Sequence, residues 1–242
     1  MRKYLLLFIL VFLSIACKEE SNKKKIIKTK NENIVERNQK NIINWKDFWE
    51  VGEGSVENFK SFGKEHESQR VSGLDIDNKP SVLWECIPDT TTVWDGGFMS
   101  KIEIDKTSSY LFVVWVKQTI NNTANIYYAF DQVQEVTGEY VKNANFIGAG
   151  SKLSELDKWY ALVGYIYPNN HQDNIEAEVI SGLYLDGVKV QDGRDFKWSN
   201  TANTPNYRVV QVNSSNIDER LYIWNPQLYK VDGTEPKLNN LL

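Results

Sequence analysis

Short runs of β-branched and aromatic residues, separated by turn-forming residues, recur along most of this chain. In residues 109–117, SYLFVVWVK, these residue types are so dense that we expect a central strand with both faces largely covered. Similar runs, bounded by Asn, Asp, Gly or Pro, predict strands at residues 71–76, 81–87, 97–104, 125–130, 160–167, 178–185, 207–212 and 220–231. No segment carries a sustained amphipathic helical stripe, so the pattern predicts an all-β fold, a two-sheet antiparallel sandwich.

The N-terminal segment has the three-part layout of a secretory signal. Two basic residues precede an apolar run over residues 4–13, which is too short to cross a bilayer comfortably, and small residues follow. The ending LSIAC resembles a bacterial lipobox, in which Cys17 is lipidated and becomes the first mature residue. The acidic residues in KEE, 18–20, resemble the surface-export signal of lipoproteins from Bacteroidetes-type bacteria. The alternative is an ordinary signal peptide with a chance cysteine.

The stretch after Cys17 is dominated by Lys, Asn, Glu and Gln and has few aromatic residues. Such a segment buries too little apolar surface to offset its conformational entropy, so we expect a tether. We therefore predict a signal peptide at 1–16, a lipidated flexible tether at 17–43 and one β-sandwich domain at 44–242. Cys86 is the one other cysteine, and its apolar neighbours predict a buried, inert thiol.

Charge and motif content argue against several function classes. The formal net charge is −4, whereas a nucleic-acid-binding face needs clustered Lys and Arg. His66 and His171 are far apart and neither stands beside a second ligand type, so we expect no transition-metal site. Glu103 and Asp105 alternate onto one side of a predicted strand, but any solvated strand face offers such a pair. We therefore predict no catalytic residues.

Three segments together resemble the jelly-roll carbohydrate-binding modules of the galactose-binding-like fold. They are YLFVVWVK at 110–117, DKWY at 157–160 and ERLYIWNPQLY at 219–229. A second resemblance, over roughly residues 93–242, is to domains of phage tail-fibre and bacterial surface proteins. It rests on DGGF, LDKWY with VGY, and VDGTEP, which occur in this order. These resemblances imply a jelly-roll β-sandwich and, more loosely, glycan binding.

Members of the wider fold often hold a structural calcium through Asp side chains and backbone carbonyls. In this chain Asn225 and Pro226 replace the usual paired acids of the closing strand. We predict no cofactor and leave a structural calcium open.

Aromatic side chains offer flat faces for sugar rings, while amides, carboxylates and guanidinium groups bind sugar hydroxyls. Trp84, Trp115, Trp159 and Trp224 lie within strand runs, so we expect them in the core. For Trp94 and Trp198, at predicted loop edges, exposure in a groove and burial are both open. The predicted ligand-binding residues are Trp94, Trp198, His171, Tyr207 and Arg208.

The stretch VWDGGF, residues 93–98, places a large aromatic beside an acid and two glycines. We expect Gly96 and Gly97 to let the strand bulge or bend, and Asp95 to be a turn residue. The bend either pushes Trp94 outward into a groove or tucks it under the sheet edge.

The sequence favours a lipid-anchored, non-catalytic protein that binds polysaccharide. Its expected location is the bacterial outer membrane or cell surface, with a periplasm-facing orientation also open. The expected partners are a glycan and, through the anchor, the membrane. A β-sandwich polysaccharide lyase or glycoside hydrolase, and a surface adhesin or assembly subunit that binds protein, are the alternatives.

Overall fold

The computed structural model describes residues 40–242 except 90–92, 142–143, 149 and 173–177. They belong to one compact unit, Gln39–Leu242. The predicted signal peptide, the predicted lipidation site Cys17 and nearly all of the predicted tether lie outside the described residues. No helix in the described part of the chain is long and apolar enough to cross a membrane.

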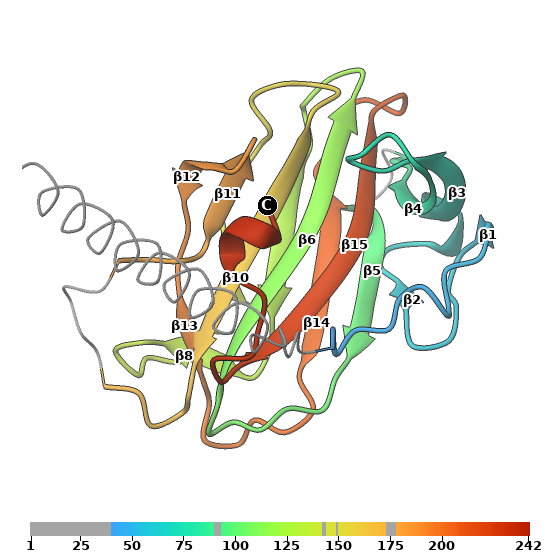
Figure 1. The fold of residues 1–242 in the computed structure, drawn as a ribbon. Helices are drawn as coiled ribbons and strands as arrows, with labels where there is room; N and C mark the ends of the chain where they lie inside the picture. Colours follow the sequence, from blue (N-terminus) through green and yellow to red (C-terminus); the bar gives the residue numbers. More distant parts are fainter. Residues whose placement is uncertain (1–39, 90–92, 142–143, 149, 173–177) are drawn as a thin grey trace, which may run out of the picture. The chain divides into compact units, whose positions relative to one another are not determined.

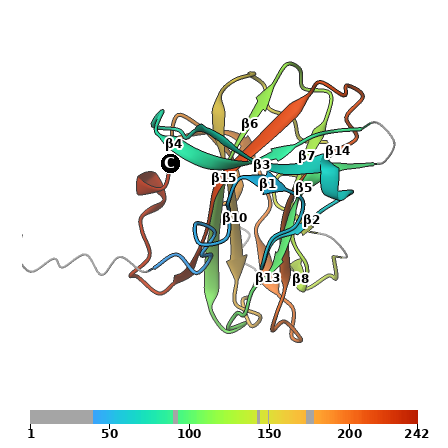
Figure 2. The same ribbon diagram turned by 90° about the vertical axis from the view of Figure 1, so that its right-hand side faces the viewer.

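Two β-sheets form the domain (Figure 1, Figure 2). In spatial order the ten-stranded sheet contains β1 (Gly52–Glu53), β3 (Ser68–Leu74), β4 (Pro80–Cys86), β15 (Arg220–Val231), β6 (Ser109–Thr119), β10 (Trp159–Tyr167), β11 (Gly182–Leu185) and β12 (Val188–Asp192), with β13 (Phe196–Trp198) beside β10 and β8 (Val133–Glu135) beside β13. The five-stranded sheet contains β2 (Lys60–Ser61), β5 (Trp94–Lys101), β14 (Asn206–Val212), β7 (Asn125–Phe130) and β9 (Ala144–Asn145). Two short 3-10 helices, η1 (Glu65–Glu67) and η2 (Leu238–Asn240), complete the described elements.

The strand order confirms the predicted jelly-roll sandwich. Neighbouring strands run β4-β15-β6-β10 in one sheet and β5-β14-β7-β9 in the other, so the chain repeatedly crosses between the sheets. This alternation is the double Greek-key order of a jelly roll. All pairings are antiparallel in the described residues except the short contact of β13 with β10.

Most of the predicted strands are confirmed. Two of them, 125–130 and 220–231, coincide with β7 and β15. Predicted strand 97–104 ends early, at Lys101, and only the last four residues of 178–185 form a strand, β11. The folded contacts also start before residue 44, because Asn41 donates to the Pro226 carbonyl at 3.1 Å.

The main core fills the space between the sheets and contains Trp84 and Cys86, both as predicted. A second apolar cluster lies on the outer face of the ten-stranded sheet, around Trp115. The expectation of core burial is confirmed for Trp115, at 4% exposed, and holds only in part for Trp159 and Trp224, which are partly buried against this cluster.

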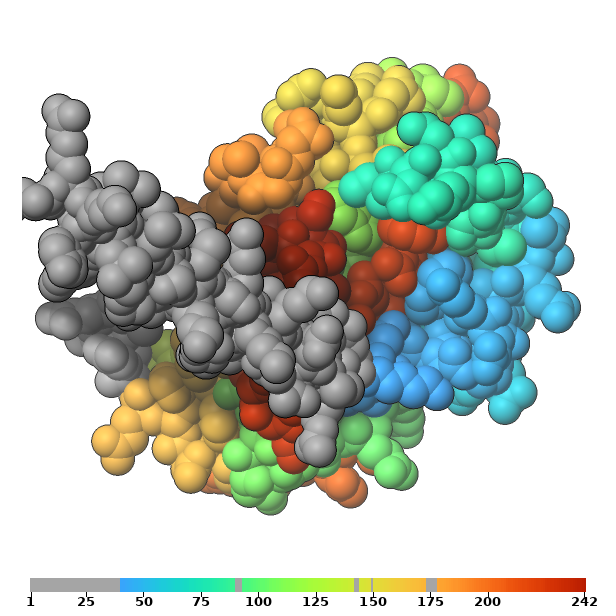
Figure 3. All heavy atoms as spheres, in the orientation of Figure 1, coloured from blue at the N-terminus to red at the C-terminus, as the bar shows by residue number. Residues whose placement is uncertain are grey.

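The C-terminal segment packs over this second cluster. Leu238, Leu241 and Leu242 contact it, and η2 lies across β10 and β6 in Figure 1. In Figure 3 the same dark red segment fills the middle of this face. The other outer face, that of the five-stranded sheet, carries the candidate site.

Candidate functional site

The bend at the start of β5 depends on its two glycines. Gly96 and Gly97 have φ angles of 95° and 116°, values that side chains rarely allow. A Cβ on Gly96 would collide with the Glu67 carbonyl oxygen, and one on Gly97 with the Val209 carbonyl oxygen. The register against β14 shifts between Val210 and Val212, which is a β-bulge. This fits the predicted architectural role of both glycines.

Trp94, just before the bend, lies on the outer face of the five-stranded sheet and is 37% exposed. Asp95 is not the turn residue that we expected. Its side chain is fully buried between the sheets, where Oδ2 accepts a hydrogen bond from the Ser214 backbone N–H at 2.7 Å. Oδ1 has no partner among the described residues. Burial raises the pKa of Asp95 to about 6.

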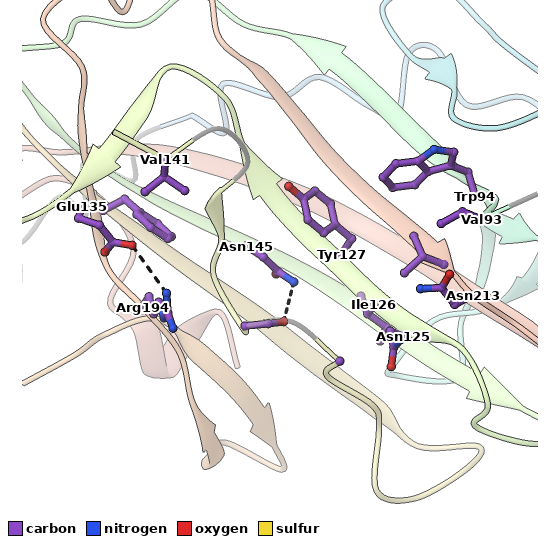
Figure 4. A pocket seen from close by; sticks show the side chains of 14 residues that line it. Val93, Trp94, Asn125, Ile126, Tyr127, Glu135, Val141, Asn145, Arg194 and Asn213 are labelled. Carbon is purple, nitrogen blue, oxygen red and sulfur yellow. Dashed lines mark hydrogen bonds and ion pairs between the residues drawn. The ribbon is translucent and has the colours of Figure 1, made fainter. Parts of the chain in front are cut away.

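A pocket of about 410 Å³ lies beside Trp94, lined by residues of the five-stranded sheet and by Glu135 of β8 and Phe196 of β13 in the other sheet (Figure 4). Among the described residues its apolar part is formed by Val93, Trp94, Ile126, Tyr127, Val141, Phe196 and Val212, and its polar part by Asn125, Glu135, Asn145, Arg194 and Asn213. In Figure 4 Trp94 stands at one end, the pair of Glu135 and Arg194 at the other, and Tyr127 between them. An apolar floor with a few polar groups is typical of a small-molecule site.

The polar groups differ in how far the fold already uses them. Asn145 is a structural residue, because its Nδ2 donates to the Gly148 carbonyl at 2.6 Å and its Oδ1 accepts from the Tyr128 N–H at 3.2 Å. Glu135 and Arg194 face each other at 3.7 Å, and the Arg194 side chain is 66% exposed. The side chains of Asn125 and Asn213 make no hydrogen bond to the rest of the described chain. Their amides are therefore available to sugar hydroxyls.

Next to the pocket, four side chains form what we call the arginine–aromatic cluster: Phe62, Trp94, Tyr127 and Arg208. The Trp94 ring meets Phe62 edge-on at 4.7 Å and Tyr127 at 6.2 Å between centroids. The Arg208 guanidinium lies 5.6 Å from the centre of the Phe62 ring. Arg208 and Tyr127 share one face of the sheet, since Val210, two residues beyond Arg208, pairs with Tyr127. The cluster therefore extends the pocket along the sheet.

The five predicted ligand-binding residues do not come together in the fold. Trp94 lines the pocket and Arg208 belongs to the cluster beside it. Exposure of Trp198 in a groove is wrong, because the ring is 0% exposed and packs edge-on against Tyr110 and Phe130. Tyr207 is 1% exposed and also belongs to the core, which removes it as a surface ligand.

His171 lies after β10 and stacks on the Tyr167 ring at 3.9 Å between centroids. It does not line the pocket as far as the described residues define it. Tyr127 was not among the predicted site residues, although the sequence contains a signal for it. In NIYYAF, residues 125–130, alternation puts Tyr127 and the buried Tyr128 on opposite faces, so one of the two had to face outward.

The described residues contain no group of three or more His, Cys, Asp or Glu side chains that could hold a metal ion. At the closing strand, the Asn225 side-chain oxygen accepts a hydrogen bond from Trp45 Nε1 at 3.1 Å. Asn225 therefore links the first folded residues to β15.

No family model matches this sequence, and no curated protein matches it. Among solved structures, an exo-β-agarase is similar at a TM-score of 0.47 and 10% identity, covering 80% of this chain and 25% of the agarase. A proposed sugar-binding protein from Bacteroides thetaiotaomicron VPI-5482 is similar at 0.42 and 14% identity, covering 79% of this chain and 100% of that protein. A structure of botulinum neurotoxin type C, a toxin whose cell entry depends on interaction with two ganglioside molecules, is similar at a TM-score of 0.34 and 9% identity. The match covers 81% of this chain and 50% of the neurotoxin chain. The chain thus spans a quarter of the agarase and half of the neurotoxin structure.

Proposed function

We propose that this chain is a lipid-anchored surface protein that binds polysaccharide, without cleaving it, in the pocket beside Trp94. The observation that carries this proposal is the placement of Trp94. Its ring is 37% exposed at the rim of a pocket of about 410 Å³ that also presents the amides of Asn125 and Asn213. Sugar rings pack their C–H faces on such aromatic surfaces, and their hydroxyl groups bind amides.

The carboxylate content of the pocket supports binding rather than hydrolysis. Glycoside hydrolysis by the usual route uses two carboxyl groups, one on each side of the scissile bond. Among the described residues that line the pocket, Glu135 is the one carboxylate, and Arg194 pairs with it at 3.7 Å. Tyr127 and Arg194 are of the types that a lyase needs, but the Tyr127 hydroxyl is buried, and burial raises its pKa. A tyrosine in that state is a poor general base at neutral pH.

The anchor belongs to the proposal on the basis of the sequence, through the lipobox-like ending at Cys17. Metabolic labelling with palmitate in a bacterial host tests it. Cys17→Ser should abolish labelling and release the protein from the membrane fraction. A labelled and membrane-bound variant would overturn the anchor without affecting the glycan site.

Binding of the full-length protein to a polysaccharide array tests the main proposal, in a detergent whose head group is not a sugar. Trp94→Ala should lower affinity for the bound polysaccharide about tenfold, since a buried stacking contact is worth on the order of 1 kcal/mol or more. Tyr140→Ala is the matched control, because that ring is 80% exposed and does not line the pocket. Binding to no polysaccharide, or equal loss in the two variants, would overturn the proposal. Release of shorter chains from the bound polysaccharide would overturn its non-catalytic part.

A further inference from the structure

We propose that the glycan bound here is anionic, and that Arg208, together with the Tyr127 hydroxyl, binds the carboxylate or sulfate group of a sugar unit that stacks on Trp94. This inference rests on the proposed glycan-binding function. It adds the chemical class of the ligand and names a second contact point beside the pocket.

Arg208 is a largely buried cation whose guanidinium group makes no hydrogen bond within the described residues. Its side chain is only 14% exposed, and Nε has no hydrogen-bond partner among the described residues. A guanidinium group offers five N–H donors in a planar fork that fits carboxylate and sulfate oxygens. Leaving such N–H donors desolvated and without hydrogen bonds is costly, so their placement favours a ligand that accepts hydrogen bonds from the guanidinium group.

The nearest carboxylate does not fill this role. Asp131 approaches the Arg208 guanidinium only to 3.7 Å, which is beyond hydrogen-bond distance. Both of its oxygens are already used by Asn206, whose backbone N–H donates to Oδ1 at 2.7 Å and whose Nδ2 donates to Oδ2 at 2.6 Å. Asp131 therefore holds Asn206 in place and leaves the charge of Arg208 only partly balanced.

A second donor without a hydrogen-bond partner in the described residues lies on the same face of the sheet. The Tyr127 hydroxyl is buried and has no hydrogen-bond partner in the described part of the chain. The Tyr127 ring lines the pocket. Burial raises the pKa of its hydroxyl, and the positive charge of Arg208 is close enough to offset part of that rise. Two adjacent donors without an acceptor are complementary to an anion and not to a neutral hydroxyl, which also brings a donor of its own.

Trp94 connects this anion site to the pocket. It contacts Tyr127 directly and reaches Arg208 through Phe62, whose ring Arg208 covers. A sugar stacked on Trp94 can therefore point a charged substituent along the sheet toward Arg208. The net charge of the chain is −4, so general attraction to polyanions does not provide this preference.

Two pairs of polysaccharides that differ mainly in charge provide the test. Polygalacturonate and its methyl ester compare a carboxylate with its neutral form, and κ-carrageenan and agarose compare a sulfated with a neutral galactan. The full-length protein should bind at least one charged member about ten- to a hundredfold more tightly than its neutral counterpart, the range expected for charge-assisted hydrogen bonds. The pair that shows the preference identifies the carboxylate or the sulfate as the source of the anion.

Arg208→Gln should remove the preference while leaving the weaker binding of the neutral polysaccharide. Tyr127→Phe, which deletes one hydroxyl and keeps the ring, should reduce the preference severalfold and guards against misfolding of the arginine variant. Arg220→Gln is the matched control, because Arg220 lies in the other sheet and donates to the carbonyls of Ile217 and Glu219 at 2.7 Å. The control should keep the full preference.

The outcomes separate this inference from the proposed function. Equal binding of charged and neutral members, or a preference that survives Arg208→Gln and Tyr127→Phe, would overturn the anion site and leave glycan binding intact. Failure to bind all four polysaccharides and every glycan on the array would overturn the glycan-binding function itself.

Discussion

The Asp95 carboxylate accepts a hydrogen bond from the Ser214 backbone N–H at 2.7 Å and so joins the start of β5 to the loop after β14. The Asp95 side chain is buried, and Asp95 directly follows Trp94 in the sequence. Glu219 is close to it, because Glu219 Oε2 accepts from the Ser214 hydroxyl at 2.5 Å. Two buried carboxyl groups therefore bind Ser214, and one of them belongs to the residue that follows Trp94 in the chain.

Asp95 should make stability depend on pH. Its pKa is raised to about 6 in the folded state, against about 3.9 in an unfolded chain. As pH rises above about 4, the unfolded chain loses this proton first, so Asp95 lowers stability progressively up to about pH 6 and uniformly above it. Asp95→Asn should remove this loss. The difference in free energy of unfolding between the variant and wild type should therefore be on the order of 1–3 kcal/mol more favourable to the variant at pH 7.5 than at pH 4.

Urea unfolding of both proteins between pH 4 and pH 7.5 measures this difference. Asp232→Asn is the control, because Asp232 is exposed and its pKa is shifted the other way by hydrogen bonds from Thr234. It should not reproduce the gain at high pH. A constant difference between wild type and Asp95→Asn across this pH range would contradict the assignment.

Gly97→Ala should destabilise the domain by about 3 kcal/mol or more, because it combines a strained φ angle with a backbone collision. Gly187→Ala provides the comparison. Gly187 also has a positive φ, of 77°, but nothing lies within 4 Å of an added Cβ, so the backbone strain acts alone and should cost about 1 kcal/mol. Thermal unfolding followed by circular dichroism ranks the two. Equal costs would show that the close approach of β14 to Gly97 is not what requires the glycine.

Most of the sheet framework could be predicted from local patterns, because long strands carry their own alternation. The two- and three-residue strands β8, β9 and β13 could not, since their hydrogen bonds come from distant partners and no local signal marks them. For the same reason, the burial of Trp198 could not be predicted from its local sequence. Its neighbours Lys197 and Ser199 are polar, and only the pairing of β13 with β8 and β10 brings the ring into the core.

The candidate site was predictable in part. Tyr207 and Arg208 are adjacent in a strand, so they must face opposite sides of the sheet. The next two residues, Val209 and Val210, are both apolar, so the pattern alone does not say which side of the strand faces the core. Tertiary structure decides that Tyr207 is inside and Arg208 outside. The outward position of Trp94 required the bulge, which its glycines signalled.

The cover formed by the C-terminal residues should stabilise the ten-stranded sheet. Leu241 packs on the apolar cluster around Trp115, so Leu241→Asp would place a charge against that surface. We expect a loss of about 1–3 kcal/mol, from lost burial and the cost of a poorly solvated carboxylate. Val188→Asp, at a side chain that is 65% exposed on β12, should change stability by less than about 0.5 kcal/mol. Chemical denaturation of the two variants measures the contrast, and similar losses would mean that the segment does not cover the cluster.

Trp198 and Trp94 should separate stability from binding. Trp198→Ala empties a fully buried ring position next to Tyr110 and Phe130 and should destabilise the domain by about 3–5 kcal/mol. The fraction that remains folded should keep its polysaccharide affinity, because the ring does not reach the pocket. Trp94→Ala should do the reverse and lower affinity with a stability loss below about 1.5 kcal/mol, since the ring is 37% exposed. Denaturation curves and binding isotherms of both variants, each measured well below its unfolding midpoint, test this. A loss of affinity in folded Trp198→Ala comparable to that of Trp94→Ala would place the binding surface elsewhere.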